Sequence, residues 1–296
     1  MEARPWLGTL LVGSSALAYS TAGFFTRLIE LDVPTMLFWR GLYAGLFMTA
    51  CIAVMQQRKT LTAFLAMGLP GLAVAILSAL ATVCYLSALR VTTVAEVLAI
   101  NATSPFISGA LAFLIIGEKE RWPVVAASLV AMLGILIMVG PGALAGHGAG
   151  AALAFVMTLA LALMIVIMRM KKSVSMLPAS CLSAFLSAIV VTPFASATIP
   201  TGATMIYLAL FGIVQFGLGL ILLTVGVRHV SALRSSLLSR LHSVLGPIWV
   251  WLAFSEVPAT TTLLGGALVI GSAFVAALVG RQANAEMDGV AASRPR

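Results

Sequence analysis

Long apolar stretches separated by short polar segments fill almost the whole chain from residue 6 to residue 280. Runs of about 20 apolar residues match the ~30 Å thickness of the bilayer hydrocarbon at 1.5 Å rise per residue. The pattern predicts ten transmembrane helices, near residues 6–28, 35–55, 64–89, 93–117, 122–140, 149–169, 177–197, 203–227, 231–255 and 260–280. The first run, 6–29, is too long for the core of a signal peptide, so we expect it to be retained. Residues 282–296 are polar and are predicted to form a disordered tail.

Composition and charge narrow the class of protein. The chain is 61% hydrophobic and 9% charged, whereas about a quarter of an ordinary soluble domain is charged. A soluble catalytic domain is therefore excluded. The net charge of +8 comes from bases scattered singly between apolar runs, which argues against nucleic-acid binding. No metal-ligand spacing appears among Cys51, Cys84 and Cys181, and no cofactor is expected.

The basic residues also predict the orientation. With the N-terminus inside, the connections on the opposite side hold only Arg27 and Arg90. The cytoplasmic segments then hold Arg4, Arg58, Lys59, Lys119, Arg121, Arg169, Lys171, Lys172, Arg228, Arg281, Arg294 and Arg296. Because short cytoplasmic loops are enriched in Lys and Arg, both termini are predicted to be cytoplasmic.

A weak internal repeat divides the chain into halves. A shift of 138 residues places Arg90 on Arg228, Thr93 on Ser231, Asn101 on Ser239, Leu114 on Leu252 and Glu118 on Glu256. Residues 1–145 and 146–281 would then each contribute five helices, and an odd number makes the second repeat inverted. Inverted repeats are typical of transporters that bind substrate near the midplane between the halves. The predicted fold class is an all-α integral membrane protein of ten helices in two inverted repeats.

Two motifs in this arrangement point to a family. Phe38-Trp39-Arg40 opens the second helix, and Pro105 stands thirteen residues before Glu118 in the fourth. The chain resembles the drug/metabolite transporter superfamily over roughly residues 6–280, and within it the EamA-type exporters, including those of aromatic amino acids. The resemblance implies export of small metabolites across a bacterial inner membrane. One departure is Ser243, which replaces the proline in the second repeat; Pro247 follows, so we expect any distortion of the ninth helix to be displaced.

Acidic residues are almost excluded from the helix interiors. The nine are Glu2, Glu30, Asp32, Glu96, Glu118, Glu120, Glu256, Glu286 and Asp288, and only Glu96 lies about a turn inside its run. Ion-coupled carriers usually keep a carboxylate in the bilayer interior. His242 is the one other group inside a helix whose ordinary pKa, near 6.5, suits proton exchange. Transport without obligatory ion coupling is therefore predicted.

Polar positions on the fourth and ninth helices form matched stripes. Asn101, Ser104 and Ser108 share one face of the fourth helix. The shift of 138 residues places Ser239, His242 and Gly246 on the corresponding face of the ninth. The stripes are expected to face a common central space and line the substrate path. The alternative is that these side chains only join helices, at about 0.6 kcal/mol each.

Other substrate-binding candidates lie on the second, third and eighth helices: Trp39 and Tyr43, then Ser78, Thr82 and Tyr85 on one face, and Gln215 near the middle of its run. A buried amide needs hydrogen-bond partners, and a substrate is one possible partner. The alternatives are an interfacial aromatic belt for Trp39 and plain packing for Tyr43.

Three arginines lie inside apolar runs. Arg40 is near the start of the second helix and is expected to reach the outer surface with its long side chain, and Arg234 and Arg240 are near the inner end of the ninth. Arg240 has no acid within reach on its own helix, so it is also a candidate to meet a substrate carboxylate.

The sequence therefore predicts an exporter that binds a small molecule between two halves in the lipid bilayer and works as a monomer by alternating access. Amino acids, aromatic ones included, are the expected substrates, and amphiphilic or cationic drugs are the alternative. A passive channel is a further possibility. An enzyme is not expected: Ser239 and His242 form a minimal nucleophile–base pair, but no elbow motif or paired intramembrane carboxylates accompany them.

Overall fold

The computed structural model describes residues 5–56, 60–92, 94–140, 148–171, 175–196, 199–255 and 259–292. Every regular element in these ranges is helical. Glu256 and several of the predicted cytoplasmic bases (Arg4, Arg58, Lys59, Lys172, Arg294 and Arg296) lie outside them.

The helices follow the ten predicted spans, and five of these spans are interrupted. In chain order they are α1 (Pro5–Ser20) with α2 (Ala22–Leu28); α3 (Val33–Gln56); α4 (Thr60–Ala66) and α5 (Gly68–Val91); α6 (Val94–Asn101) with α7 (Ser104–Ile116); α8 (Trp122–Val139); α9 (Gly148–Met170); α10 (Leu177–Val191), followed by the short turn η3 (Thr192–Phe194); α11 (Ala203–Leu210), η4 (Phe211–Leu218) and α12 (Gly219–Gly226); α13 (Ala232–Ser239) with α14 (Leu241–Phe254); and α15 (Thr260–Ala292). Within the described ranges, nine of these spans are long and apolar enough to cross a bilayer. The exception, α1 with α2, is broken at Thr21.

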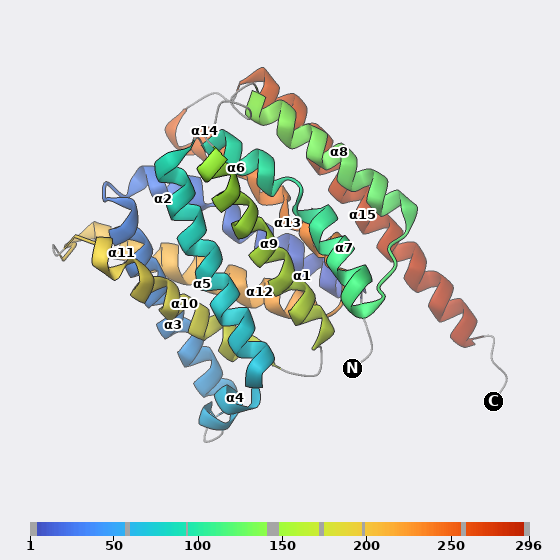
Figure 1. Cartoon of the computed structure of the whole chain (residues 1–296), viewed down its shortest axis with the longest axis horizontal. Coiled ribbons are helices and arrows are strands. Elements are labelled where there is room, and N and C mark those ends of the chain that lie inside the picture. Colours follow the sequence, from blue (N-terminus) through green and yellow to red (C-terminus); the bar gives the residue numbers. More distant parts are fainter. Residues whose placement is uncertain are drawn as a thin grey trace.

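Contacts between helices repeat when the two halves are exchanged. The second, fourth and fifth spans each pack on their own counterpart, as α3 on α10, α7 on α13 and α8 on α15. The third span packs on the sixth, as α5 on α9, and correspondingly α12 packs on α1. Figure 1 shows α8 and α15 side by side along one edge of the bundle. The inverted five-helix repeat is thus expressed in the packing.

The fourth and ninth spans break at matching positions, which corrects one prediction. The fourth span is interrupted at Ala102 and Thr103, and the ninth at Arg240. The shift of 138 residues places Ala102 on Arg240, so the distortion is not displaced. In the fourth span, Pro105 lies in the first turn of α7, where its missing N–H costs nothing. In the ninth, Pro247 is accommodated inside α14 and does not set the break.

Hydroxyl groups account for the break in the first span. Ser20 Oγ donates to the carbonyl of Leu17 at 2.6 Å, and Thr21 Oγ1 donates to that of Ala18 at 2.7 Å. Side-chain bonds to carbonyls of the preceding turn compete with the helical ladder and bend helices. The chain therefore changes direction at Thr21 and continues as α2.

The third span contains Pro70-Gly71, which suggests that its first turns form a separate segment, and it does begin as the separate helix α4 and restart at Gly68, whose φ of +56° suits glycine. One predicted boundary differs. The tail, predicted to be disordered from residue 282, instead continues α15 to Ala292, and Figure 1 shows this part projecting from the bundle. The segment is rich in Ala with Gln, Glu and Met, which favour helix even where charge discourages burial.

Candidate functional site

At one end of the bundle, the loop between α7 and α8 is bound to the second half of the chain. Glu118 Oε1 accepts hydrogen bonds from Arg169 Nε at 2.9 Å and Arg169 Nη2 at 2.7 Å. Arg169 Nη1 also donates to the carbonyl of Arg228 at 2.7 Å. Arg169 lies on α9, so this two-pronged ion pair joins the halves. We call this end, where Lys119, Arg121, Arg169, Lys171 and Arg228 gather, the basic end.

The same loop caps the N-terminus of α13. Glu118 Oε2 accepts from the backbone N–H of Ala232 at 3.1 Å. The Glu120 carboxylate accepts from Ser231 Oγ and, at 3.2 Å, from Arg234 Nη2. Carboxylates at a helix N-terminus satisfy free N–H groups and complement the helix dipole. We call the two carboxylates and their partners the basic-end network.

A second charged group lies deep in the bundle with no such partners. The Arg40 guanidinium stacks on Phe216 at 4.3 Å from its ring centroid and lies 5.4 Å from that of Phe211. Its Nε is buried without a hydrogen-bond partner. Among the described residues, the ionisable side chains near enough to interact with its charge are Tyr19 and Tyr85. Arg40 therefore holds a charge among aromatic rings with no acid beside it.

The local helix geometry explains how two phenylalanines reach one guanidinium. Phe211 and Phe216 are five residues apart, which in an α-helix would place them about 140° from each other. The segment η4 is a π-helix, in which hydrogen bonds run from residue i to i+5 and bring such residues toward one face. Gly212 permits the close approach of α3, since a β-carbon there would lie 2.7 Å from the Arg40 carbonyl oxygen.

Gln215 lies between the two phenylalanines, in the middle of the span Ala203–Gly226, and is 3% exposed. Its Nε2 donates to the backbone carbonyl of Tyr19 at 3.4 Å. Its Oε1 is buried and has no partner among the described residues. We call Tyr19, Arg40, Tyr85, Phe211, Gln215 and Phe216 together the Arg40 cluster.

The structure assembles some of the predicted residues around this cluster. Trp39 and Tyr43 stack on each other along α3, with ring centroids 6.0 Å apart, and pack against a buried group that includes Phe211. On α5, Tyr85 is 38% exposed and lies near enough to Arg40 for their charges to interact, whereas Thr82 Oγ1 bonds back to the carbonyl of Ser78 at 3.1 Å. Ser78 and Thr82 are half-buried on the same helix face as Tyr85.

The other predicted residues form a separate group where the fourth and ninth spans cross. Ser104 Oγ shares a 2.8 Å hydrogen bond with Ser236 Oγ, and both side chains are buried. Arg240 Nη1 donates to the carbonyl of Asn101 at 3.1 Å, which places the cation at the C-terminal end of α6. In this conformation Ser104 and Arg240 join helices.

Within the ninth span, side chains beside the break at Arg240 form hydrogen bonds with backbone carbonyls. Ser239 Oγ donates to the carbonyl of Ser235 at 2.8 Å, and His242 Nδ1 is hydrogen-bonded to the carbonyl of Ser239. The nucleophile–base geometry considered for Ser239 and His242 is not formed in this conformation, because each side chain bonds a backbone carbonyl instead. Asn101 Oδ1 remains buried without a partner.

Sequence reasoning missed the role of Arg40 and the contributions of Tyr19, Phe211 and Phe216. Arg40 does not extend to the surface as expected; its guanidinium stacks on Phe216 of the opposite half. The available signal was a basic residue in an apolar run with no acid nearby. The phenylalanines gave no signal, because their spacing is wrong for one face of an α-helix.

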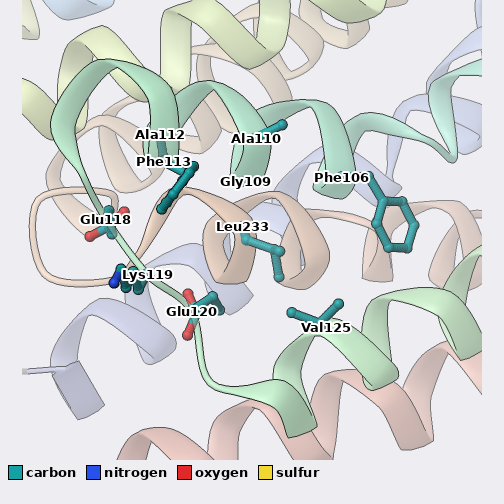
Figure 2. A pocket seen from close by; sticks show the side chains of 10 residues that line it. All are labelled: Phe106, Gly109, Ala110, Ala112, Phe113, Glu118, Lys119, Glu120, Val125 and Leu233. Carbon is teal, nitrogen blue, oxygen red and sulfur yellow. The ribbon is translucent and has the colours of Figure 1, made fainter.

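A pocket of about 440 Å³ lies between α7, α8 and α13, beside the basic-end network. Figure 2 shows Glu118, Lys119 and Glu120 along one side and Phe106, Phe113, Val125 and Leu233 around the rest. Gly109, Ala110 and Ala112 of α7 complete the wall. The pocket is therefore mainly apolar, with charged groups at the basic end.

Comparisons with known proteins agree with this architecture. The model of the EamA-like transporter family matches the chain twice, at residues 6–140 and 148–278. A crystal structure of another protein aligns with a TM-score of 0.76 at 21% sequence identity, covering 93% of this chain and 98% of the other. Such low identity shows the fold alone, and neither match singles out the aromatic amino-acid exporters. A comparison with curated proteins found no match.

Proposed function

Because this multi-pass membrane chain belongs to the EamA-like transporter family, we propose that it exports small metabolites, amino acids including aromatic ones, by alternating access. We place it in a bacterial inner membrane as a monomer, with both termini in the cytoplasm. The family is one of transporters, which favours transport over intramembrane catalysis.

The observation that carries this proposal is the basic-end network. Its bonds run from the α7–α8 loop of the first half to α9 and α13 of the second. All are polar contacts, and water can replace each of them when the two halves separate. Such a contact holds a cytoplasmic end closed while the opposite end admits or releases substrate, and its loss would open the cytoplasmic side.

The location of the acids supports transport without obligatory ion coupling. Glu30, Asp32, Glu118 and Glu120 follow or precede helices, and Glu96 lies in the first turn of α6. No described carboxylate lies near the middle of a span, where a coupling ion would be bound and released. His242 is the titratable imidazole inside a span, and it is hydrogen-bonded to the Ser239 carbonyl.

Counterflow in proteoliposomes tests the proposal. Vesicles with the purified chain are loaded with unlabelled L-phenylalanine, and uptake of labelled L-phenylalanine is followed without a pH or sodium gradient. We expect saturable counterflow that ends at equal concentrations on the two sides. Uphill accumulation driven by a proton gradient, abolished in His242→Gln, would contradict the uncoupled mechanism. Ohmic single-channel currents would instead identify a channel.

Labelling of single cysteines tests the orientation. An impermeant thiol reagent applied to intact cells should label a cysteine at Gly202, which lies between η3 and α11, but not one at Lys171 at the end of α9. The reverse pattern would invert the proposed topology.

The pocket beside α13 favours a second candidate, efflux of amphiphilic cations. Its mainly apolar wall suits an apolar body, and Glu118 and Glu120 at one end, although paired with Arg169 and Arg234, add negative charge. The same vesicles would be assayed with tetraphenylphosphonium. Counterflow of this cation with none of L-phenylalanine would replace the amino-acid proposal by this one.

A further inference from the structure

The guanidinium of Arg40 has unused hydrogen-bonding capacity. A guanidinium carries five N–H donors in a flat fork, yet among the described residues Arg40 contacts aromatic faces. Its Nε is buried and unpaired, and the side chain as a whole is only half-buried, so its outer nitrogens can be reached. A charge kept inside a membrane span without an acid is a mark of function. The missing partner is an anion, and the fork matches a carboxylate.

Gln215 has the complementary unpaired group, a hydrogen-bond acceptor. Its NH₂ group is engaged by the Tyr19 carbonyl, which orients the amide and leaves Oε1 as a buried acceptor without a donor. A buried unpaired acceptor costs free energy, and an ammonium group would satisfy it. Because the oxygen is neutral, it can accept from an ammonium without adding a charge that would pair with Arg40 and cancel it.

The two unpaired groups are connected through shared neighbours. Gln215 is adjacent in sequence to Phe216, on whose ring Arg40 stacks, and the Tyr19 that orients Gln215 also lies near enough to interact with Arg40. The site combines α1, α3 and α5 of the first half with η4 of the second, at the middle of the eighth span. A ligand there would touch both halves, as a substrate must if it is to be passed between them.

We propose that the Arg40 cluster binds the zwitterionic backbone of an α-amino acid, with the carboxylate on the Arg40 guanidinium and the ammonium on Gln215 Oε1. The rings of Tyr19 and Tyr85 then border the amino-acid side chain. This assignment deepens the proposed function and rests on it.

Arg240 provides the internal contrast. It is also buried inside a span, but its Nη1 is held by the Asn101 carbonyl at the end of α6. The Arg240 Nε and the Asn101 Oδ1 are also buried without partners, as are the corresponding atoms of Arg40 and Gln215. The two interior arginines differ in that Arg240 already donates a hydrogen bond to a helix end, whereas the contacts of Arg40 are with aromatic rings.

Three probes distinguish the contact with Arg40 from the contact with Gln215. L-Phenylalanine has both charged groups, 3-phenylpropanoate lacks the ammonium, and phenethylamine lacks the carboxylate. Affinity would be measured by calorimetry on the purified full chain and on Arg40→Gln, Arg40→Lys and Gln215→Leu. Lys171→Gln removes an exposed charge of the same sign and serves as the matched control.

The expected pattern is specific to each variant. Arg40→Gln should weaken L-phenylalanine and 3-phenylpropanoate about tenfold or more and leave phenethylamine within about twofold. Arg40→Lys, which keeps the charge but loses the fork, should fall between. Gln215→Leu should weaken L-phenylalanine and phenethylamine but not 3-phenylpropanoate. Retained phenethylamine binding by Arg40→Gln shows that this variant is folded.

The outcomes distinguish the two proposals. If the natural chain performs L-phenylalanine counterflow but Arg40→Gln binds all three probes unchanged, or loses all three alike, the site assignment is wrong and the exporter proposal stands. If the natural chain neither binds nor transports any probe, both are wrong.

Discussion

The charged groups of the basic-end network are paired within the protein, whereas the charged group of the Arg40 cluster is not. In the network, each carboxylate has at least two donors, and the side chains of the Glu118–Arg169 pair are only 18% and 12% exposed. In the cluster, a guanidinium and an amide oxygen both lack partners. Both regions join the first half of the chain to the second. One is complete within the protein, and the other becomes complete only with a ligand.

The difference separates two tasks that a carrier needs. A paired network stabilises one arrangement of the halves by itself and can be exchanged for water when they part. An unpaired site stabilises an arrangement only when substrate is present, so it links binding to the position of the halves.

Neutralising Glu118 should have the largest effect on stability. Glu118→Gln leaves the Arg169 guanidinium without its carboxylate and weakens the cap on α13. Breaking a buried pair costs roughly 3–5 kcal/mol, and residual exposure reduces our expectation to about 2–3 kcal/mol. Denaturant unfolding in mixed micelles measures the free energy. Lys119→Gln, at the exposed position next in the loop, should change it by less than about 0.5 kcal/mol. Equal changes in the free energy of unfolding for the two variants would show that the network does not stabilise the fold.

An added side-chain carbon between α3 and η4 should disturb the packing of the Arg40 cluster. In Gly212→Ala, the new β-carbon would lie 2.6 Å from Tyr43 Cβ and 2.7 Å from the Arg40 carbonyl oxygen. Overpacking of this kind costs about 1–3 kcal/mol. We expect lower stability and weaker L-phenylalanine binding together. Gly13→Ala, where nothing lies within 4 Å of the added carbon, should be neutral or stabilising. Loss of stability in Gly13→Ala alone would refute the packing argument.

Removing the ring beneath the cation should weaken binding moderately. Phe216→Leu keeps an apolar side chain but abolishes the cation–π contact with Arg40, worth about 0.5–2 kcal/mol. We expect L-phenylalanine affinity to fall about fivefold, with phenethylamine nearly unchanged. Phe274→Leu, at a 64% exposed position on α15, is the control and should change neither. Equal weakening of both ligands in Phe216→Leu would point to a packing role.

A third polar group, Asp32 just before the N-terminus of α3, should show the smallest effect. Partial burial tends to raise the pKa of Asp32, but hydrogen bonds from Thr35 and Ser196 outweigh this and hold the pKa below its ordinary value. Because the folded pKa is the lower one, the carboxylate stabilises the fold above pH ~4 and loses this contribution as the pH falls below it.

Asp32 is largely exposed, so the expected contribution is only about 0.5 kcal/mol. Asp32→Asn should therefore lose a few tenths of a kcal/mol at pH 7 and nothing near pH 2, as measured by unfolding at the two pH values. Thr26→Ala provides a matched control, since its hydroxyl bonds only a carbonyl of its own helix. An equal deficit of Asp32→Asn at both pH values would exclude the charged form as the cause.

The spans were predictable because lipid imposes them. Apolar runs of sufficient length fixed the helices, and the odd number in each half gave the inversion. The breaks were predictable only in part: Pro105 marks the fourth span, but the ninth breaks at Arg240, where no local residue type demands it. Sequence alone also could not show that the tail is helical to Ala292, since its polarity argued against burial but not against helix.

The candidate site was harder to predict, for a geometric reason. Gln215 and Tyr85, which lie in the Arg40 cluster, were selected from polarity and position. The partners of Arg40 depend on the π-helical turn, which rotates Phe211 and Phe216 onto one face against the α-helical periodicity used to read the sequence. Ser104 and Ser239 were selected by the same periodicity and instead bond to Ser236 and to the Ser235 carbonyl.

The meeting of the two helix breaks has an evolutionary consequence. Arg240, at the break of the ninth span, bonds the carbonyl of Asn101, at the break of the fourth. If the halves descend from one duplicated ancestor, the proline stands in only one copy today while the interruption is present in both. What the two copies share is therefore the touching pair of interruptions and not the proline. Drift in either copy would be tolerated as long as the other supplies a side chain that satisfies the exposed backbone.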